Sequence, residues 1–243
     1  MKGQWTNIYS GDLPLRSWWV DSVNESKYVS IVLPEVFGIN NWIRSFSEKL
    51  AQQNVPVLAL PLYGRTAPNL DLAYSEEDLK LGRHHKNLTT LKNIIEDVSA
   101  AINWVKEKYP SKKISIIGFC FGGHAAFIAS SLKGIESSFC FYGAGIVSLR
   151  NDTNSAPIDL LEKVSGKLNF ICGSSDDLIP LRDRLEIKKR FKKYDPFGKR
   201  FSYVEIENAD HGFMCEERDS FDEAASLIGS VSYTHLTLPT IFR

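Results

Sequence analysis

Residues 113–123 read KISIIGFCFGG, and this stretch decides the fold. An apolar strand pattern ends at Gly118 and a helical pattern begins at Gly122, so Cys120 stands on the tight turn between them, in the arrangement called a nucleophile elbow. A nucleophile on such a turn needs a strained backbone, and the small neighbours let strand and helix approach each other closely. The helix N-terminus favours an ionised thiol. The alternative is a buried structural cysteine in a glycine-rich turn.

Similar apolar runs lie on both sides of this stretch. Most lack polar alternation, which is typical of strands buried on both faces of a parallel sheet. These runs cover residues 28–34, 55–61, 113–118, 137–143, 167–173 and 201–206. Helical spacing of apolar residues appears between them, over residues 41–53, 89–108, 122–132, 181–193 and 218–228. The alternation predicts an α/β fold, a mostly parallel central sheet with helices on both faces. Residues 18–20 predict an additional, antiparallel edge strand.

Length and composition fit one domain. A chain of 243 residues can remove about 70% of its unfolded surface from water, so its core needs neither disulfides nor metals. We expect a single domain over residues 1–230. Residues 231–243 (VSYTHLTLPTIFR) form an atypical tail that resembles translated vector sequence. This tail is either foreign to the natural gene or an ordinary flexible C-terminus.

The charge balance excludes several classes of partner. There are 29 basic and 29 acidic side chains, which argues against nucleic acid and anionic membranes. No apolar run approaches the ~20 residues of a membrane span, and the N-terminus lacks the apolar core of a signal peptide.

The four cysteines show no CxxC pairing, which suits a reducing compartment. We therefore expect a soluble, cytoplasmic protein, either a monomer or a small homo-oligomer.

Two further segments supply partners for Cys120. Asp176 and Asp177 follow the predicted strand over residues 167–173, and His211 follows the strand over residues 201–206. The order nucleophile, acid, histidine is that of enzymes with this turn. Because the carboxyl ends of parallel strands meet at one edge of a sheet, we expect the three side chains to converge there.

Six motifs together resemble the dienelactone hydrolase family of α/β-hydrolases, from about residue 29 to residue 228. They are LPEVFG at 33–38, LYGR at 62–65, GFCFGG at 118–123, FYG at 141–143, DDLIP at 176–180 and HGF at 211–213. The resemblance implies the α/β-hydrolase fold and an activity like that of carboxymethylenebutenolidase.

The resemblance also implies roles for particular residues. Cys120 is the nucleophile, His211 is the base, and Asp176 orients it, because the family's acid stands four residues before the proline. Glu35 is expected beside the thiol, where it holds or exchanges the thiol proton until substrate displaces it. The backbone N–H groups of Val36 and Phe121 are expected to form the oxyanion hole. A turn-capping carboxylate is the alternative for Glu35.

Substrates of the family's founding members carry a carboxylate, for which Arg83 and Arg218 are the candidate ligands. A place on the surface, the commoner one for arginine, is the alternative for both. Arg65 is expected to brace the turn after residues 55–61. Residues 62–86 lack clear periodicity and suit a lid or binding loop. His124 is expected to pack away from the substrate, and we expect neither a metal nor an organic cofactor.

These features predict a cysteine-dependent hydrolase of small lactones or activated esters, acting through a thioester acyl-enzyme. Two alternatives remain open. One is a general carboxylesterase or thioesterase on the same triad. The other is a non-catalytic α/β-hydrolase scaffold that binds a small molecule or a protein partner.

Overall fold

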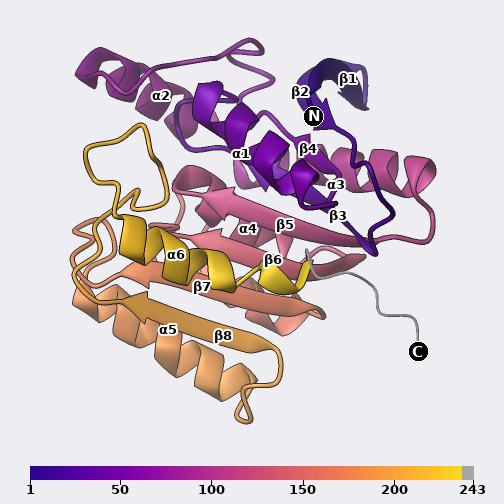
Figure 1. The fold of residues 1–243 in the computed structure, drawn as a ribbon. Helices are drawn as coiled ribbons and strands as arrows, with labels where there is room; N and C mark the ends of the chain where they lie inside the picture. Colours follow the sequence, from indigo (N-terminus) through magenta and orange to yellow (C-terminus); the bar gives the residue numbers. More distant parts are fainter. Residues whose placement is uncertain (237–243) are drawn as a thin grey trace.

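The computed structural model describes residues 1–236, which form an eight-stranded sheet with helices on both of its faces (Figure 1). The strands lie in the order β1-β2-β4-β3-β5-β6-β7-β8, and all pairs from β4 to β8 are parallel. The strands are β1 (Gln4–Ser10), β2 (Leu13–Val20), β3 (Tyr28–Leu33), β4 (Val57–Ala59), β5 (Lys113–Phe119), β6 (Ile135–Phe141), β7 (Lys167–Gly173) and β8 (Phe201–Ile206). The predicted α/β architecture is thereby confirmed.

The helices form two layers. They are α1 (Asn41–Gln52), α2 (Glu76–Leu88), α3 (Leu91–Lys108), α4 (Phe121–Ala129), α5 (Leu181–Tyr194) and α6 (Glu223–Val231), with short 3₁₀ helices at Pro157–Lys163 and Thr234–Leu236. Helices α1 and α6 cover one face of the sheet, and α3, α4 and α5 cover the other (Figure 1). Helix α4 packs centrally, against β3, β5 and β6, and every one of its residues is buried.

The N-terminal edge of the sheet differs from the prediction. Residues 18–20 do belong to an antiparallel strand, β2, but β1 pairs along its outer side, so β2 is not the edge. Strand β1 alternates exposed and partly buried side chains, and only Ile8 is fully buried. It therefore lacks the continuous apolar run by which the inner strands are recognised.

Two helices also differ from the prediction. Residues 62–86 contain most of α2, which begins after the N-cap Ser75 and has Gly82 as its single buried residue. A helix that buries a glycine shows no apolar stripe in its sequence. Helix α6 begins at Glu223 rather than near residue 218, because the Asp222 side chain caps it by accepting from the Ala225 N–H at 2.8 Å.

The predicted tail starts inside the described part of the chain. Helix α6 continues to Val231, and the Tyr233 ring lies 6.1 Å from that of Phe46 on α1. Leu236 is buried. Residues 237–243 lie outside the described residues. Within residues 1–236, no helix has the length and apolar character needed to cross a membrane.

Candidate active site

Cys120 occupies the turn between β5 and α4 with φ 53° and ψ −114°. A positive φ is costly for a residue with a side chain, of the order of 1–3 kcal/mol, and such strain concentrates at functional sites. The flanking glycines make this turn possible. A Cβ on Gly118 would lie 2.0 Å from the Gly122 carbonyl oxygen, and one on Gly122 would lie 2.0 Å from the Leu33 carbonyl oxygen. The close approach of strand and helix expected from the sequence is confirmed.

His211 and Asp176 meet at the same edge of the sheet. The Nδ1 atom of His211 lies 2.8 Å from Oδ2 of Asp176, and both side chains are buried. The other carboxylate oxygen of Asp176 accepts the Leu178 N–H at 2.9 Å. Asp177, the alternative acid, is exposed. Of the two neighbouring carboxylates, the structure therefore pairs Asp176 with the histidine.

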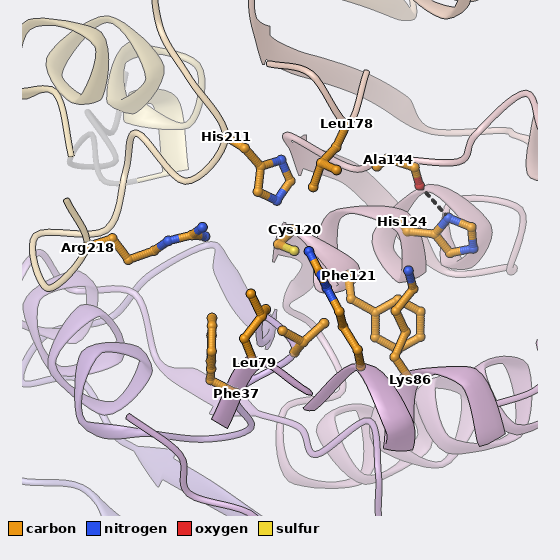
Figure 2. A pocket seen from close by; sticks show the side chains of 12 residues that line it. Phe37, Leu79, Lys86, Cys120, Phe121, His124, Ala144, Leu178, His211 and Arg218 are labelled. Carbon is orange, nitrogen blue, oxygen red and sulfur yellow. Dashed lines mark hydrogen bonds between the residues drawn. The ribbon is translucent and has the colours of Figure 1, made fainter. Parts of the chain in front are cut away.

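The electrostatics of His211 are set by its two neighbours. Burial lowers the pKa of this imidazole, but the Cys120 sulfur and the Asp176 carboxylate outweigh burial and raise the pKa to about 10. Its Nε2 atom has no hydrogen-bond partner among the described residues. Figure 2 shows the imidazole beside Cys120, with one ring nitrogen directed at the sulfur. The arrangement can therefore take a proton from the thiol and hold it.

Cys120 and His211 line one pocket of about 90 Å³ (Figure 2). Its walls are formed by Val36, Phe37, Leu79, Arg83, Lys86, Cys120, Phe121, His124, Ala144, Leu178, His211 and Arg218. Phe121 is the first residue of α4, where a backbone N–H has no intrahelical acceptor. Val36 lies just beyond β3, and its carbonyl oxygen would lie 2.3 Å from a Cβ on Gly82. Gly82 therefore lets α2 sit directly on the segment that carries Val36.

Glu35 is buried beside this pocket and binds Arg218. The Nη1 atom of Arg218 donates to Oε1 of Glu35 at 2.9 Å, while Oε2 has no partner among the described residues. Burial raises the pKa of Glu35, and the Arg218 charge opposes that rise. The sequence placed Glu35 beside the thiol, yet within residues 1–236 its ion pair is with Arg218 and it forms no hydrogen bond with Cys120.

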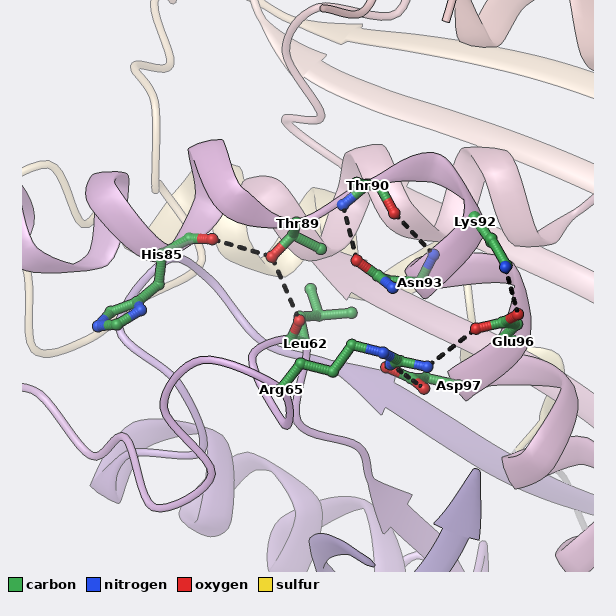
Figure 3. Close-up of polar contacts among 9 residues, drawn as sticks. All are labelled: Leu62, Arg65, His85, Thr89, Thr90, Lys92, Asn93, Glu96 and Asp97. Carbon is green, nitrogen blue, oxygen red and sulfur yellow. Dashed lines mark hydrogen bonds and ion pairs between the residues drawn. The ribbon is translucent and has the colours of Figure 1, made fainter. Parts of the chain in front are cut away.

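The arginines separate into two groups. Arg83 and Arg218 both line the pocket. Arg65 does not; it ties the segment after β4 to α3 (Figure 3). Its Nη1 lies 2.5 Å from both carboxylate oxygens of Asp97, and its Nη2 lies 2.9 Å from Glu96. Arg65 is thus the expected brace, and its partners come from the neighbouring helix.

Two pocket residues were missed or misplaced by sequence reasoning. Lys86 lines the pocket three residues after Arg83, and this helical spacing on α2 was the signal that could have found it. His124 was expected to pack away from the substrate, and that expectation is wrong. It lines the pocket, with its ring stacked on that of Phe121 and its Nδ1 atom 2.8 Å from the Ala144 carbonyl oxygen. Residues 1–236 contain no cluster of three or more potential metal ligands.

The sequence profile of the Dienelactone hydrolase family matches residues 16–229. The chain belongs to the dienelactone hydrolase family. It is therefore an enzyme, a hydrolase of ester or lactone bonds. The matched span includes both partners in each pair described above, Asp176 with His211 and Glu35 with Arg218.

Individual members of the family are similar over most of the chain. A Synechocystis sp. protein named for carboxymethylenebutenolidase is 32% identical over 222 residues, which cover 90% of this chain and 89% of the relative. A Saccharomyces cerevisiae protein with a similar name is 26% identical over 215 residues, 82% of this chain and 76% of the relative. A crystal structure from Klebsiella pneumoniae, named for dienelactone hydrolase, covers 97% of both chains with a TM-score of 0.84 at 19% identity. This last likeness shows that the fold is shared.

Proposed function

We propose that the protein is a cysteine-dependent hydrolase of small lactones or activated esters, acting through a thioester acyl-enzyme. One observation carries the proposal. Cys120 stands in a strained turn on a pocket that it shares with His211, and that histidine is held by Asp176 at 2.8 Å. A nucleophile, a base and a group that orients the base are the parts that acyl transfer requires.

In the proposed reaction, Cys120 transfers its proton to His211 and its sulfur attacks the carbonyl carbon. The backbone N–H groups of Val36 and Phe121 stabilise the resulting oxyanion, and one such donor typically lowers the barrier by about 3 kcal/mol. His211 then protonates the leaving oxygen as the C–O bond breaks, which leaves a thioester on Cys120. The same histidine activates water, which hydrolyses the thioester and restores the thiol. No step requires a metal or an organic cofactor.

The choice of a sulfur nucleophile favours substrates with a stabilised leaving group. A thiolate is itself a good leaving group. The tetrahedral intermediate therefore reverts to substrate unless the ester or lactone oxygen of the substrate leaves at least as easily as the sulfur. Enol lactones and aryl esters provide such an oxygen, whereas simple alkyl esters do not. Arg83 and Arg218 supply charge on the same pocket for a substrate carboxylate.

The function is tested by turnover of a dienelactone and of an activated aryl ester, each with and without prior treatment with iodoacetamide. We expect both to be hydrolysed, and alkylation to abolish the activity, because Cys120 is the partly exposed thiol while Cys140, Cys172 and Cys215 are buried. Hydrolysis of aryl esters alone would favour a general carboxylesterase or thioesterase. No turnover of either, with Cys120 alkylated readily, would favour a binding scaffold.

We further propose that Glu35 keeps the resting thiol protonated. Glu35 is buried and bound to Arg218, which lines the pocket together with Cys120. A carboxylate beside a thiol disfavours ionisation of the sulfur through like-charge repulsion. Glu35→Ala is therefore expected to speed the alkylation of Cys120 by iodoacetamide several-fold near neutral pH. The measurement is the alkylation rate as a function of pH. Glu107→Ala, which removes an exposed carboxylate on α3, is the matched control and should leave the rate unchanged. Identical profiles for Glu35→Ala and the wild type would remove Glu35 from this role.

A further inference from the structure

A second cavity opens beside the catalytic pocket, and we call it the side pocket. Its volume is about 250 Å³, and most of its wall comes from residues within 86–90, at the end of α2, and within 144–152, in the loop after β6. Lys86, Phe121, His124 and Ala144 line both cavities. The two cavities are therefore neighbouring chambers of one cleft. A substrate bound at Cys120 has room to extend along these four residues into the side pocket.

The wall of the side pocket is held in place by Arg150. His124 Nδ1 lies 2.8 Å from the Ala144 carbonyl oxygen, so it donates there, and its Nε2 accepts from Arg150 Nη1 at 2.7 Å. Burial lowers the pKa of His124 to about 4, which keeps the ring neutral. The other two guanidinium nitrogens donate to the Thr89 carbonyl oxygen at 2.8 Å and to Asp152 at 2.9 Å. Each nitrogen of Arg150 is thus engaged within the wall.

Lys86 is the cation that the two chambers share. It is exposed on α2, and it forms no ion pair with any carboxylate of residues 1–236. In Figure 2 its amine lies next to His124, on the side of the pocket opposite Arg218. An anionic group placed there would contact Lys86 without displacing a contact of the protein.

The charges around the catalytic pocket are unbalanced. Glu35 neutralises Arg218, and Asp176 pairs with His211. Arg83 and Lys86, three residues apart on α2, have no such partner in the described part of the chain. Since two uncompensated cations face one small cleft, the cleft suits a ligand with two negative groups.

We propose that the substrate is an ester or lactone with two carboxylates. The first lies at Arg83 beside the reacting carbonyl, and the second lies at Lys86, where the substrate passes into the side pocket. The inference rests on the proposed function and adds to it a second anionic group, for which Lys86 is the specificity-determining residue.

The test compares two aryl esters with the same leaving group, the 4-nitrophenyl monoester of glutarate, with one free carboxylate, and that of tricarballylate, with two. We expect the wild type to prefer the dianionic ester by about tenfold in kcat/KM, the effect of one charge-assisted contact at a partly exposed site. Lys86→Met should remove this preference by lowering kcat/KM for the tricarballylate ester about tenfold, with a smaller fall for the glutarate ester. Lys80→Met, on the same helix but outside the pocket, should retain the preference.

Equal rates on the two esters, or a preference that survives Lys86→Met, would overturn the inference while leaving the proposed function intact. Absence of any hydrolysis would instead count against the proposed function. In that case calorimetric titration of the wild type and Lys86→Met with glutarate, which carries two carboxylates, and butyrate, which carries one, decides the inference. Tighter binding of glutarate that is lost in the variant supports it, and equal binding of the two acids to the wild type overturns it.

Discussion

Replacing Cys120 with alanine is expected to lower kcat/KM by about 10⁴-fold or more, the usual effect of removing a catalytic nucleophile. The pocket, the N–H groups of Val36 and Phe121, and the His211–Asp176 pair all remain in this variant, so substrate should still bind. Alanine also accepts the same backbone strain as cysteine, because both carry a Cβ at φ 53°. Thermal unfolding should therefore shift by only a few degrees at most. The measurement is steady-state hydrolysis of an aryl ester together with a melting curve.

A second cysteine provides the control. Cys172 is buried on β7, where its sulfur lies 3.2 Å from the Tyr203 hydroxyl. Cys172→Ala should cost stability, of the order of 1 kcal/mol for the lost packing, and leave the hydrolysis rate largely unchanged. If Cys120→Ala retained activity within tenfold of the wild type, the covalent mechanism would be wrong. A water molecule activated directly by His211 would then be the better account.

The strands and the elbow could be predicted because their signals are local. An inner strand of a parallel sheet is a short apolar run, and the turn at Cys120 needs glycines at positions 118 and 122. Each signal lies within about ten residues of sequence. Helix α2 gave no such signal, because its buried face is Gly82 and its pocket face carries Arg83 and Lys86. A hydrophobic pattern cannot reveal a helix whose pocket-facing side chains are largely charged.

The contacts of the site were harder to predict than its members. Glu35 and Arg218 are 183 residues apart, and nothing in the neighbourhood of either specifies the other. Their ion pair exists because the segment after His211 crosses from β8, past three intervening strands, to the end of β3. His124 shows the opposite problem. Helical phase placed it away from the substrate, but the loop that supplies Ala144 and Arg150 extends the cleft to its side of α4.

Asp176→Asn is expected to lower kcat by about 10³- to 10⁴-fold with little change in the fold, because it gives His211 the wrong tautomer. The Leu178 N–H now donates to Oδ1 of Asp176 at 2.9 Å, and it would hold the asparagine carbonyl oxygen in that place. The amide NH₂ would then face His211 Nδ1, which must become an acceptor. The ring proton moves to Nε2, the nitrogen that has to accept the proton of Cys120.

The same substitution should lower the pKa of His211, because the Asp176 carboxylate is one of the groups that raise it to about 10. Histidine NMR titration and the pH profile of kcat/KM measure this shift. Asp177→Asn is the matched control: this neighbouring carboxylate is exposed, and its loss should leave both the rate and the pKa unchanged. If Asp177→Asn abolished the activity, or if Asp176→Asn left it unchanged, Asp176 would not be the residue that orients His211. The 2.8 Å contact between Asp176 and His211 is the physical reason to expect neither result.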